Sequence, residues 1–252
     1  MQLKDVAVLI TGGGSGLGAA TARAMAAKGA KIAVLDQSKE NAEKVAAEVK
    51  GVPVVADVTD EEQVKAAIAK AEAAHGIARV LVNCAGIGGS QRIVGKDGVY
   101  PLAKFARVIN VNLIGTFNVL RLFSERLLTD APVGEERGVI INTASVAAYE
   151  GQIGQIAYSA SKGGVVGLTL PAARDLAQHK IRVNTIAPGL FLTPLLMGLN
   201  EEARKSLGAQ VPHPARLGDA SEYGNLAVHI VENAMLNGET IRLDGAIRMA
   251  PR

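Results

Sequence analysis

Seven short runs rich in β-branched residues alternate along this 252-residue chain with longer stretches rich in Ala, Glu and Lys. Such alternation of strands and helices is typical of βαβ units with a parallel sheet. The runs are almost wholly apolar, as expected of strands that helices cover on both faces. The expected strands are 6–11, 31–36, 52–57, 79–84, 138–143, 181–186 and 239–244, and the main expected helices are 17–28, 39–49, 60–74, 103–128, 156–178 and 219–232.

This pattern runs through the chain without a linker, a change in composition or an internal repeat. We therefore predict an α/β fold: a single-domain, Rossmann-type, doubly wound parallel sheet of about seven strands with helices on both faces. Residues 1–252 would form this domain, with a cofactor half at about 1–143 and a catalytic and substrate half at about 144–252. The irregular segments 87–102 and 188–218 follow strands, and loops of this length often serve as lids or binding loops.

Composition and charge narrow the classes of function. The net charge is +3 with scattered basic residues and 3% aromatic residues, which disfavours a nucleic-acid partner. The apolar run 6–10 is too short for a signal sequence or a membrane span, so we expect a soluble, cytoplasmic protein. Cys84 is the only cysteine, which excludes an internal disulfide. The four histidines fall in no ligand pattern, so no metal is expected.

The sequence TGGGSGLG at 11–18 directly follows the first expected strand and opens a helix. Glycines there allow backbone N–H groups and a helix N-terminus to approach a diphosphate, although a tight turn alone would also explain them. Asp36 ends the second strand, where an acid bonds the ribose hydroxyls of NAD and repels the 2′-phosphate of NADP. It could instead cap the next helix. These residues predict NAD as the cofactor.

Tyr158 and Lys162 lie one helical turn apart and share one helix face. A free tyrosine has a pKa of about 10. A cation about 4 Å away could lower it by about three units, so Lys162, helped by the positive nicotinamide of an oxidised cofactor, could make the phenol an acid–base group near neutral pH. Ser145 follows the fifth strand, where its hydroxyl could hold a substrate oxygen. The Tyr–Lys pair alone could be a coincidence of the helix surface, but the full set in this order indicates an active site.

With these residues the whole chain resembles the short-chain dehydrogenase/reductase family. The matching segments are the turn at 11–18, NCAG at 83–86, NVNLIGTF at 110–117, and YSASK at 158–162. The resemblance implies a catalytic set of Asn112, Ser145, Tyr158 and Lys162, in which Asn112 holds a water in a proton relay from Lys162. Asn112 could equally bond a neighbouring backbone group.

The resemblance also implies a set of cofactor contacts. Thr193 would contact the nicotinamide carboxamide, and Asp57 either belongs to the cofactor wall or caps the helix from residue 60. The implied cofactor-binding residues are Gly12, Ser15, Gly16, Leu17, Gly18, Asp36, Asp57, Val58, Asn83, Ala85, Gly86, Tyr158, Lys162, Pro188, Gly189 and Thr193.

Longer stretches, including GVIINTASVAAYEGQIGQIAYSASKGG and APGLFLTPLL, resemble the type II 3-hydroxyacyl-CoA dehydrogenases within that family. This narrower resemblance implies NAD-dependent interconversion of 3-hydroxyacyl-CoA and 3-ketoacyl-CoA in fatty acid metabolism, by a homotetramer with no membrane partner. The open alternatives are a hydroxysteroid or other secondary alcohol as substrate, a 3-oxoacyl-carrier-protein reductase, which usually takes NADPH, and a non-catalytic NAD-sensing subunit.

The substrate-binding residues are less specific. An apolar group near the sixth strand could line an acyl slot or pack onto the core: Leu190, Leu192, Leu195, Leu196 and Met197. A group of cations could meet CoA phosphates or be solvated surface charge: Arg92, Lys96, Arg204 and Lys205.

Overall fold

The computed structural model describes residues 1–96, 98–198 and 200–251. Seven parallel strands form one sheet in the order β3-β2-β1-β4-β7-β8-β9. They are β1 (Ala7–Thr11), β2 (Lys31–Asp36), β3 (Val52–Val55), β4 (Val80–Asn83), β7 (Gly138–Thr143), β8 (Ile181–Pro188) and β9 (Thr240–Leu243). The chain builds outward from β1 to β3 on one side and from β4 to β9 on the other, which confirms the predicted doubly wound fold.

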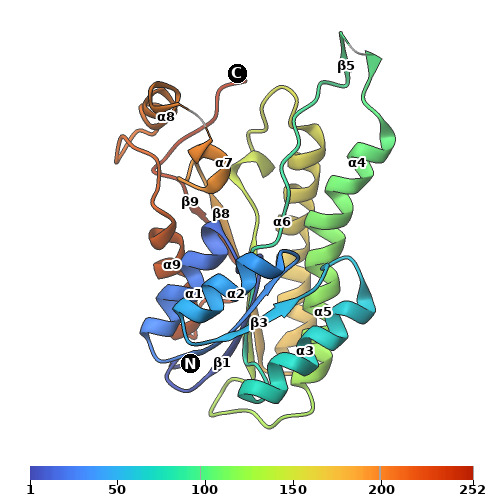
Figure 1. Ribbon diagram of the computed structural model, residues 1–252, viewed down its shortest axis with the longest axis vertical. Coiled ribbons are helices and arrows are strands. Elements are labelled where there is room, and N and C mark those ends of the chain that lie inside the picture. Colours follow the sequence, from blue (N-terminus) through green and yellow to red (C-terminus); the bar gives the residue numbers. More distant parts are fainter. Residues whose placement is uncertain (97, 199, 252) are drawn as a thin grey trace.

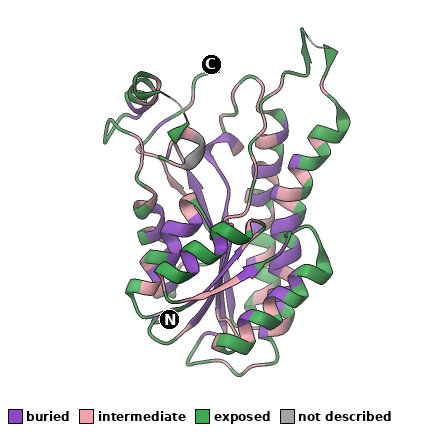
Figure 2. Ribbon diagram, viewed as in Figure 1, coloured by how far each residue is buried: buried purple, intermediate pink, exposed green. Residues whose placement is uncertain are grey.

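Helices cover both faces of the sheet (Figure 1). On one face lie α1 (Gly16–Ala27), α2 (Lys39–Glu48) and α9 (Ala220–Glu232), and on the other lie α3 (Glu61–His75), α5 (Gly115–Leu127) and α6 (Ile156–Ala177). Successive strand residues point to opposite faces, so Val8 and Ile10 join the first core cluster and Leu9 joins the second. Both clusters bury the apolar strands (Figure 2).

Three segments differ from the expected elements. The helix expected at 103–128 is a continuous run of α4 (Leu102–Ile109), a π-helical turn η1 (Asn110–Ile114) and α5. Segment 87–102 contains a short hairpin, β5 (Val94–Gly95) and β6 (Gly98–Val99), and segment 188–218 contains α7 (Pro194–Met197) and α8 (Glu201–Gly208). The hairpin and α7–α8 rise on opposite sides of the same end of the molecule (Figure 1). The hairpin strands are exposed, whereas α8 mixes exposed with half-buried residues (Figure 2).

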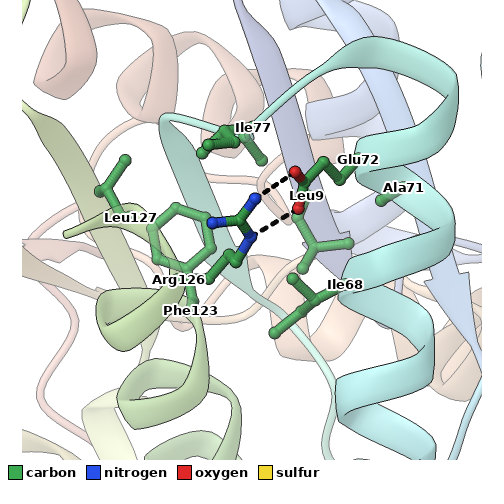
Figure 3. A pocket seen from close by; sticks show the side chains of 9 residues that line it. Leu9, Ile68, Ala71, Glu72, Ile77, Phe123, Arg126 and Leu127 are labelled. Atoms are coloured by element: carbon green, nitrogen blue, oxygen red, sulfur yellow. Dashed lines mark hydrogen bonds and ion pairs between the residues drawn. The ribbon is translucent and has the colours of Figure 1, made fainter. Parts of the chain in front are cut away.

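A small cavity lies between α3 and α5 near the start of β4 (Figure 3). Arg126 pairs with Glu72 beside it, and Arg126 Nε donates to Glu72 Oε2 at 2.7 Å. The volume of this cavity, about 10 Å³, is at the lower limit for one water molecule. The cavity is therefore a packing gap and not a ligand site.

Of the helices within the described ranges, none combines the length and the apolar character needed to cross a membrane. The same residues contain no group of three His, Cys, Asp or Glu side chains placed to hold a metal ion.

Candidate active site

The glycine-rich turn after β1 is packed too tightly for side chains. Gly12 has φ +61°, and a Cβ there would lie 2.7 Å from Ala85 N. A Cβ on Gly18 would collide with the carbonyl oxygen of Gly12. Ser15 is exposed at the N-cap of α1, and its side chain makes no capping bond to the described residues. The hydroxyl and the first N–H groups of α1 are therefore available to an anion, which fits a diphosphate.

Asp36 fastens this turn to the end of β2. Its Oδ2 accepts from Gly14 N at 3.0 Å and its Oδ1 accepts from Ser38 N at 2.9 Å. The cap of α2 is Ser38, whose hydroxyl accepts from Asn41 N at 3.3 Å, so the alternative that Asp36 caps this helix is wrong. The carboxylate therefore stands beside the glycine-rich turn, where a ribose would lie in a fold of this type.

Asp57 and Val58 follow β3 at the same edge. Asp57 is exposed, and its Oδ1 accepts from both the N–H and the hydroxyl of Thr59, at 2.9 and 2.8 Å. The cap of α3 is Asp60, so the capping alternative for Asp57 is wrong as well. Val58 is buried, and its carbonyl oxygen accepts from Asn118 Nδ2 at 2.9 Å.

The NCAG segment at 83–86 lies between the glycine-rich turn and the candidate catalytic residues. Asn83 is buried and donates to Asn142 Oδ1 at 3.0 Å, while Ala85 N donates to Thr11 Oγ1 at 3.2 Å. These bonds connect β4 to β7 and β1. A Cβ on Gly86 would lie 3.3 Å from Asn112 Oδ1 and 3.6 Å from Lys162 Nζ. Because Gly86 has no side chain, the backbone of this segment can pack closely against Asn112 and Lys162.

Lys162 and Tyr158 share one face of α6, as expected. Lys162 Nζ lies 5.8 Å from the centroid of the Tyr158 ring and donates to the backbone oxygen of Thr143 at 2.7 Å. Lys162 is buried, and burial lowers its pKa to about 8. Thr143 was not predicted, because its contribution is a backbone carbonyl that leaves no signal in the sequence. An ammonium has three donors, so the one bond to Thr143 leaves capacity for a ligand.

Ser145 lies beside Tyr158 at the end of β7. It begins the short 3₁₀ helix η2 (Val146–Ala148), and its hydroxyl accepts from Ala147 N at 3.1 Å. Burial raises the pKa of the Tyr158 phenol, while a hydrogen bond with the Ser145 side chain opposes that rise. In the protein alone, burial therefore disfavours the phenolate more than Ser145 favours it. The expected lowering of this pKa involves Lys162 together with the positive nicotinamide of bound NAD, so it remains a prediction.

Asn112 is fully buried in the π-helical turn η1. Its Oδ1 accepts from Ile87 N at 2.8 Å, and its Nδ2 donates to Ile87 O at 2.9 Å and to Ser161 Oγ at 3.0 Å. The alternative that Asn112 bonds a neighbouring backbone is therefore confirmed. Ser161 was not predicted as its partner. Because the Asn112 side chain holds the start of segment 87–102, its role in a proton relay remains a prediction.

The segment after β8 carries the remaining candidates. Pro188 ends β8, Gly189 N donates to Leu243 O at 2.9 Å, and Thr193 is half-buried at the N-cap of α7. Leu192 and Met197 are exposed, whereas Leu190 and Leu196 are half-buried. The residue that packs into the core here is Phe191, which was not predicted. The side chain of Leu195 lies outside those described.

A glycine-rich turn at the centre of a doubly wound sheet, with an acid–base pair at the same edge, defines the class of nucleotide-dependent oxidoreductases. The chain belongs to the short chain dehydrogenase family, whose family model matches residues 6–204. Membership implies a nicotinamide cofactor.

Three relatives illustrate the breadth of the similarity. A 3-hydroxyacyl-CoA dehydrogenase type-2 of Bos taurus is 54% identical over 257 residues, covering 99% of this chain and 98% of the relative. A crystal structure of 3-hydroxyacyl-CoA dehydrogenase type-2 from Mycobacterium avium matches with a TM-score of 0.95 at 41% identity, covering 100% of this chain and 99% of that one. A 3-oxoacyl-acyl-carrier-protein reductase of Thermotoga maritima is 35% identical, with 98% and 99% covered.

Proposed function

We propose that this protein is an NAD-dependent oxidoreductase that interconverts a 3-hydroxyacyl-CoA and a 3-ketoacyl-CoA. The observation that carries the proposal is the placement of Ser145, Tyr158 and Lys162 at the sheet edge that also holds the glycine-rich turn. The similarity to proteins named 3-hydroxyacyl-CoA dehydrogenase type-2 supports the substrate class.

Each residue has a defined task in this proposal. The glycine-rich turn, Asp36 and Lys162 would hold a nicotinamide cofactor, which would supply or accept a hydride at C3 of the substrate. Ser145 donates a hydrogen bond to the C3 oxygen, and Tyr158 gives its proton to that oxygen during reduction or takes it during oxidation. Lys162 stabilises the phenolate that reduction leaves on Tyr158. Asn112 completes the proton path, and its bonds to Ile87 hold the adjoining loop in place.

We expect ketone reduction to slow as the pH rises through about 8. Burial lowers the pKa of Lys162 to about 8, so the ammonium is charged at pH 7 and becomes neutral at higher pH. A neutral Lys162 no longer stabilises the phenolate, so kcat/KM should fall about tenfold per pH unit above that point. Steady-state kinetics between pH 6 and 10 measure this profile, and a flat profile would contradict the role of Lys162.

We expect NADH to be preferred over NADPH by about 10²-fold in kcat/KM, because the Asp36 carboxylate repels a 2′-phosphate. Asp36→Asn should reduce the preference at least about tenfold, since it removes the charge and keeps an acceptor for one of the backbone N–H groups. Asp175→Asn is the matched control, because Asp175 is an exposed carboxylate of α6 that is not among the expected cofactor contacts. Comparable kcat/KM for both cofactors in the native protein would refute the assignment.

The substrate class is tested by comparing three kinds of ketone with NADH: acetoacetyl-CoA, a 3-oxoacyl thioester of acyl carrier protein, and a ketosteroid. The proposal predicts the highest kcat/KM for acetoacetyl-CoA. A preference for the carrier-protein thioester would favour the reductase class to which the Thermotoga maritima relative belongs. Cofactor binding without turnover of any ketone would favour the NAD-sensing alternative.

The remaining inferences are a cofactor half at 1–143, a catalytic half at 144–252, a homotetramer and a cytoplasmic location. Ile114 and Phe117 are 47% and 51% exposed where α5 begins, and such apolar exposure supports self-association. The free thiol of Cys84 is compatible with a reducing compartment.

A further inference from the structure

An open cavity of about 390 Å³ lies where three distant parts of the chain meet. Its walls are residues 90–92, which precede the β5–β6 hairpin, residues 152–154, which precede α6, and Pro251 in the C-terminal tail. Gln91 N donates to the backbone oxygen of Gly154 at 2.9 Å, and Ile153 N donates to that of Pro251 at 3.0 Å. The size is typical of a small-molecule site, and backbone hydrogen bonds hold all three walls together.

Two walls of the cavity are close in sequence to residues of the active site. Gly154 precedes Tyr158 by four residues, and Ser90 follows Gly86 by four residues. Four residues of extended chain span at most about 14 Å, so Gly154 lies within that reach of Tyr158 and Ser90 within that reach of Gly86. A Cβ on Gly86 would lie 3.3 Å from Asn112 Oδ1. The C-terminus and the β5–β6 hairpin stand at the same end of the molecule (Figure 1). A ligand in this cavity could therefore extend one arm to Tyr158.

The lining favours an anionic, polar group. Arg92 provides a guanidinium, and Ser90 and Gln152 provide further polar side chains. Lys104 adds a second cation, because its Nζ donates to Gln91 Oε1 at 3.4 Å. A neighbouring carboxylate, Glu150, is already neutralised by Arg242, which donates to its two oxygens at 2.7 and 2.8 Å. A lining of this kind suits a phosphate better than an acyl chain.

Resting on the proposed function, we propose that this cavity binds the phosphate end of a phosphopantetheine thioester and that Arg92 contacts a phosphate. The pantetheine arm would lead from the cavity to Tyr158 and place the thioester there. Coenzyme A and acyl carrier protein both present this phosphorylated arm. The C-terminal tail thereby becomes part of substrate recognition, because Gln152 Nε2 also donates to Ala250 O at 3.1 Å.

The test is calorimetric titration with free coenzyme A and with pantetheine, which lacks the phosphates. In Arg92→Ala we expect the Kd for coenzyme A to rise about tenfold, as for loss of a hydrogen bond to a charged group, and the Kd for pantetheine to stay unchanged. Arg107→Ala, which removes an exposed arginine from α4, is the matched control and should bind coenzyme A normally. The ratio of kcat/KM for acetoacetyl-CoA to that for the carrier-protein thioester identifies which of the two carriers the cavity prefers.

Equal affinity of native protein and Arg92→Ala for coenzyme A would overturn the inference, and so would equal weakening in Arg92→Ala and Arg107→Ala. A different result would contradict the proposed function alone: Arg92-dependent binding of coenzyme A without NADH-dependent reduction of any 3-ketoacyl thioester. In that case the cavity remains a phosphopantetheine site, and the reaction has to be sought elsewhere.

Discussion

Tyr158→Phe is expected to lower kcat for ketone reduction by about 10²- to 10⁴-fold, the usual contribution of a general acid. The substitution removes the hydroxyl that gives its proton to the substrate oxygen. It keeps the ring, which lies 5.8 Å from Lys162 Nζ. The affinity for NADH should change little, because the cofactor turn and Lys162 remain in place. Stopped-flow or steady-state measurement of NADH consumption gives kcat directly.

Tyr149→Phe is the matched control for this substitution. Tyr149 is 47% exposed, and its ring packs against the Arg242 guanidinium 5.0 Å away, so its hydroxyl has no task in the proposed reaction. This variant should retain kcat. Near-normal turnover by Tyr158→Phe would instead assign the proton transfer to another group.

Gly18→Ala is expected to weaken NADH binding by about 5- to 150-fold, which corresponds to the 1–3 kcal/mol typical of overpacking. A methyl group on Gly18 would collide with the carbonyl oxygen of Gly12 and lie 3.0 Å from the Cα of Gly13. All of these are backbone atoms of the turn, so relief requires the turn itself to open. Fluorescence titration with NADH measures the Kd, and thermal unfolding shows how much stability is lost.

Gly167→Ala controls for the effect of adding a methyl group to a helix. Gly167 lies within α6, and a Cβ there meets no described heavy atom within 4 Å. It should leave the Kd unchanged and stabilise the helix by about 0.8–1 kcal/mol, the propensity difference between Gly and Ala. Native affinity for NADH in Gly18→Ala would show that the turn does not approach the cofactor.

The fold was predictable from the sequence because its signals are local. Apolar β-branched runs such as 138–143 reveal strands that are buried on both faces, and their alternation with helices implies the doubly wound sheet. The spacing of Tyr158 and Lys162 was likewise enough to place them on one helix face. Family membership followed from the order of such segments along the whole chain.

Features that depend on the tertiary environment were not predictable. The π-helical turn at Asn112 keeps the apolar pattern of an ordinary helix, so nothing in the spacing reveals it. The capping residues Ser38 and Asp60 could not be separated from nearby Asp36 and Asp57, because several side chains of similar chemistry stand within four residues of each helix start. The raised pKa of Tyr158 depends on burial, which the spacing to a lysine does not report.

The cavity lined by residues 90–92, residues 152–154 and Pro251 could not be predicted from the sequence either. Gln152 and Ala250 are 98 positions apart, yet a hydrogen bond of 3.1 Å joins their segments. Arg92 is one of four cations that could meet CoA phosphates, and no sequence pattern distinguishes it from the other three. The structure separates them, since Arg92 lines the cavity while Lys205 pairs with Glu201 on an exposed helix at 2.8 Å.

The central claim is hydride transfer between NADH and C3 of a 3-ketoacyl-CoA. Its most direct test uses acetoacetyl-CoA with NADH deuterated at C4 on one face of the ring, followed by mass spectrometry of the thioester. We expect 3-hydroxybutyryl-CoA that carries one deuterium at C3 from one of the two C4-labelled forms and none from the other. Formation of no 3-hydroxybutyryl-CoA, or of product without deuterium from either form, would contradict the account.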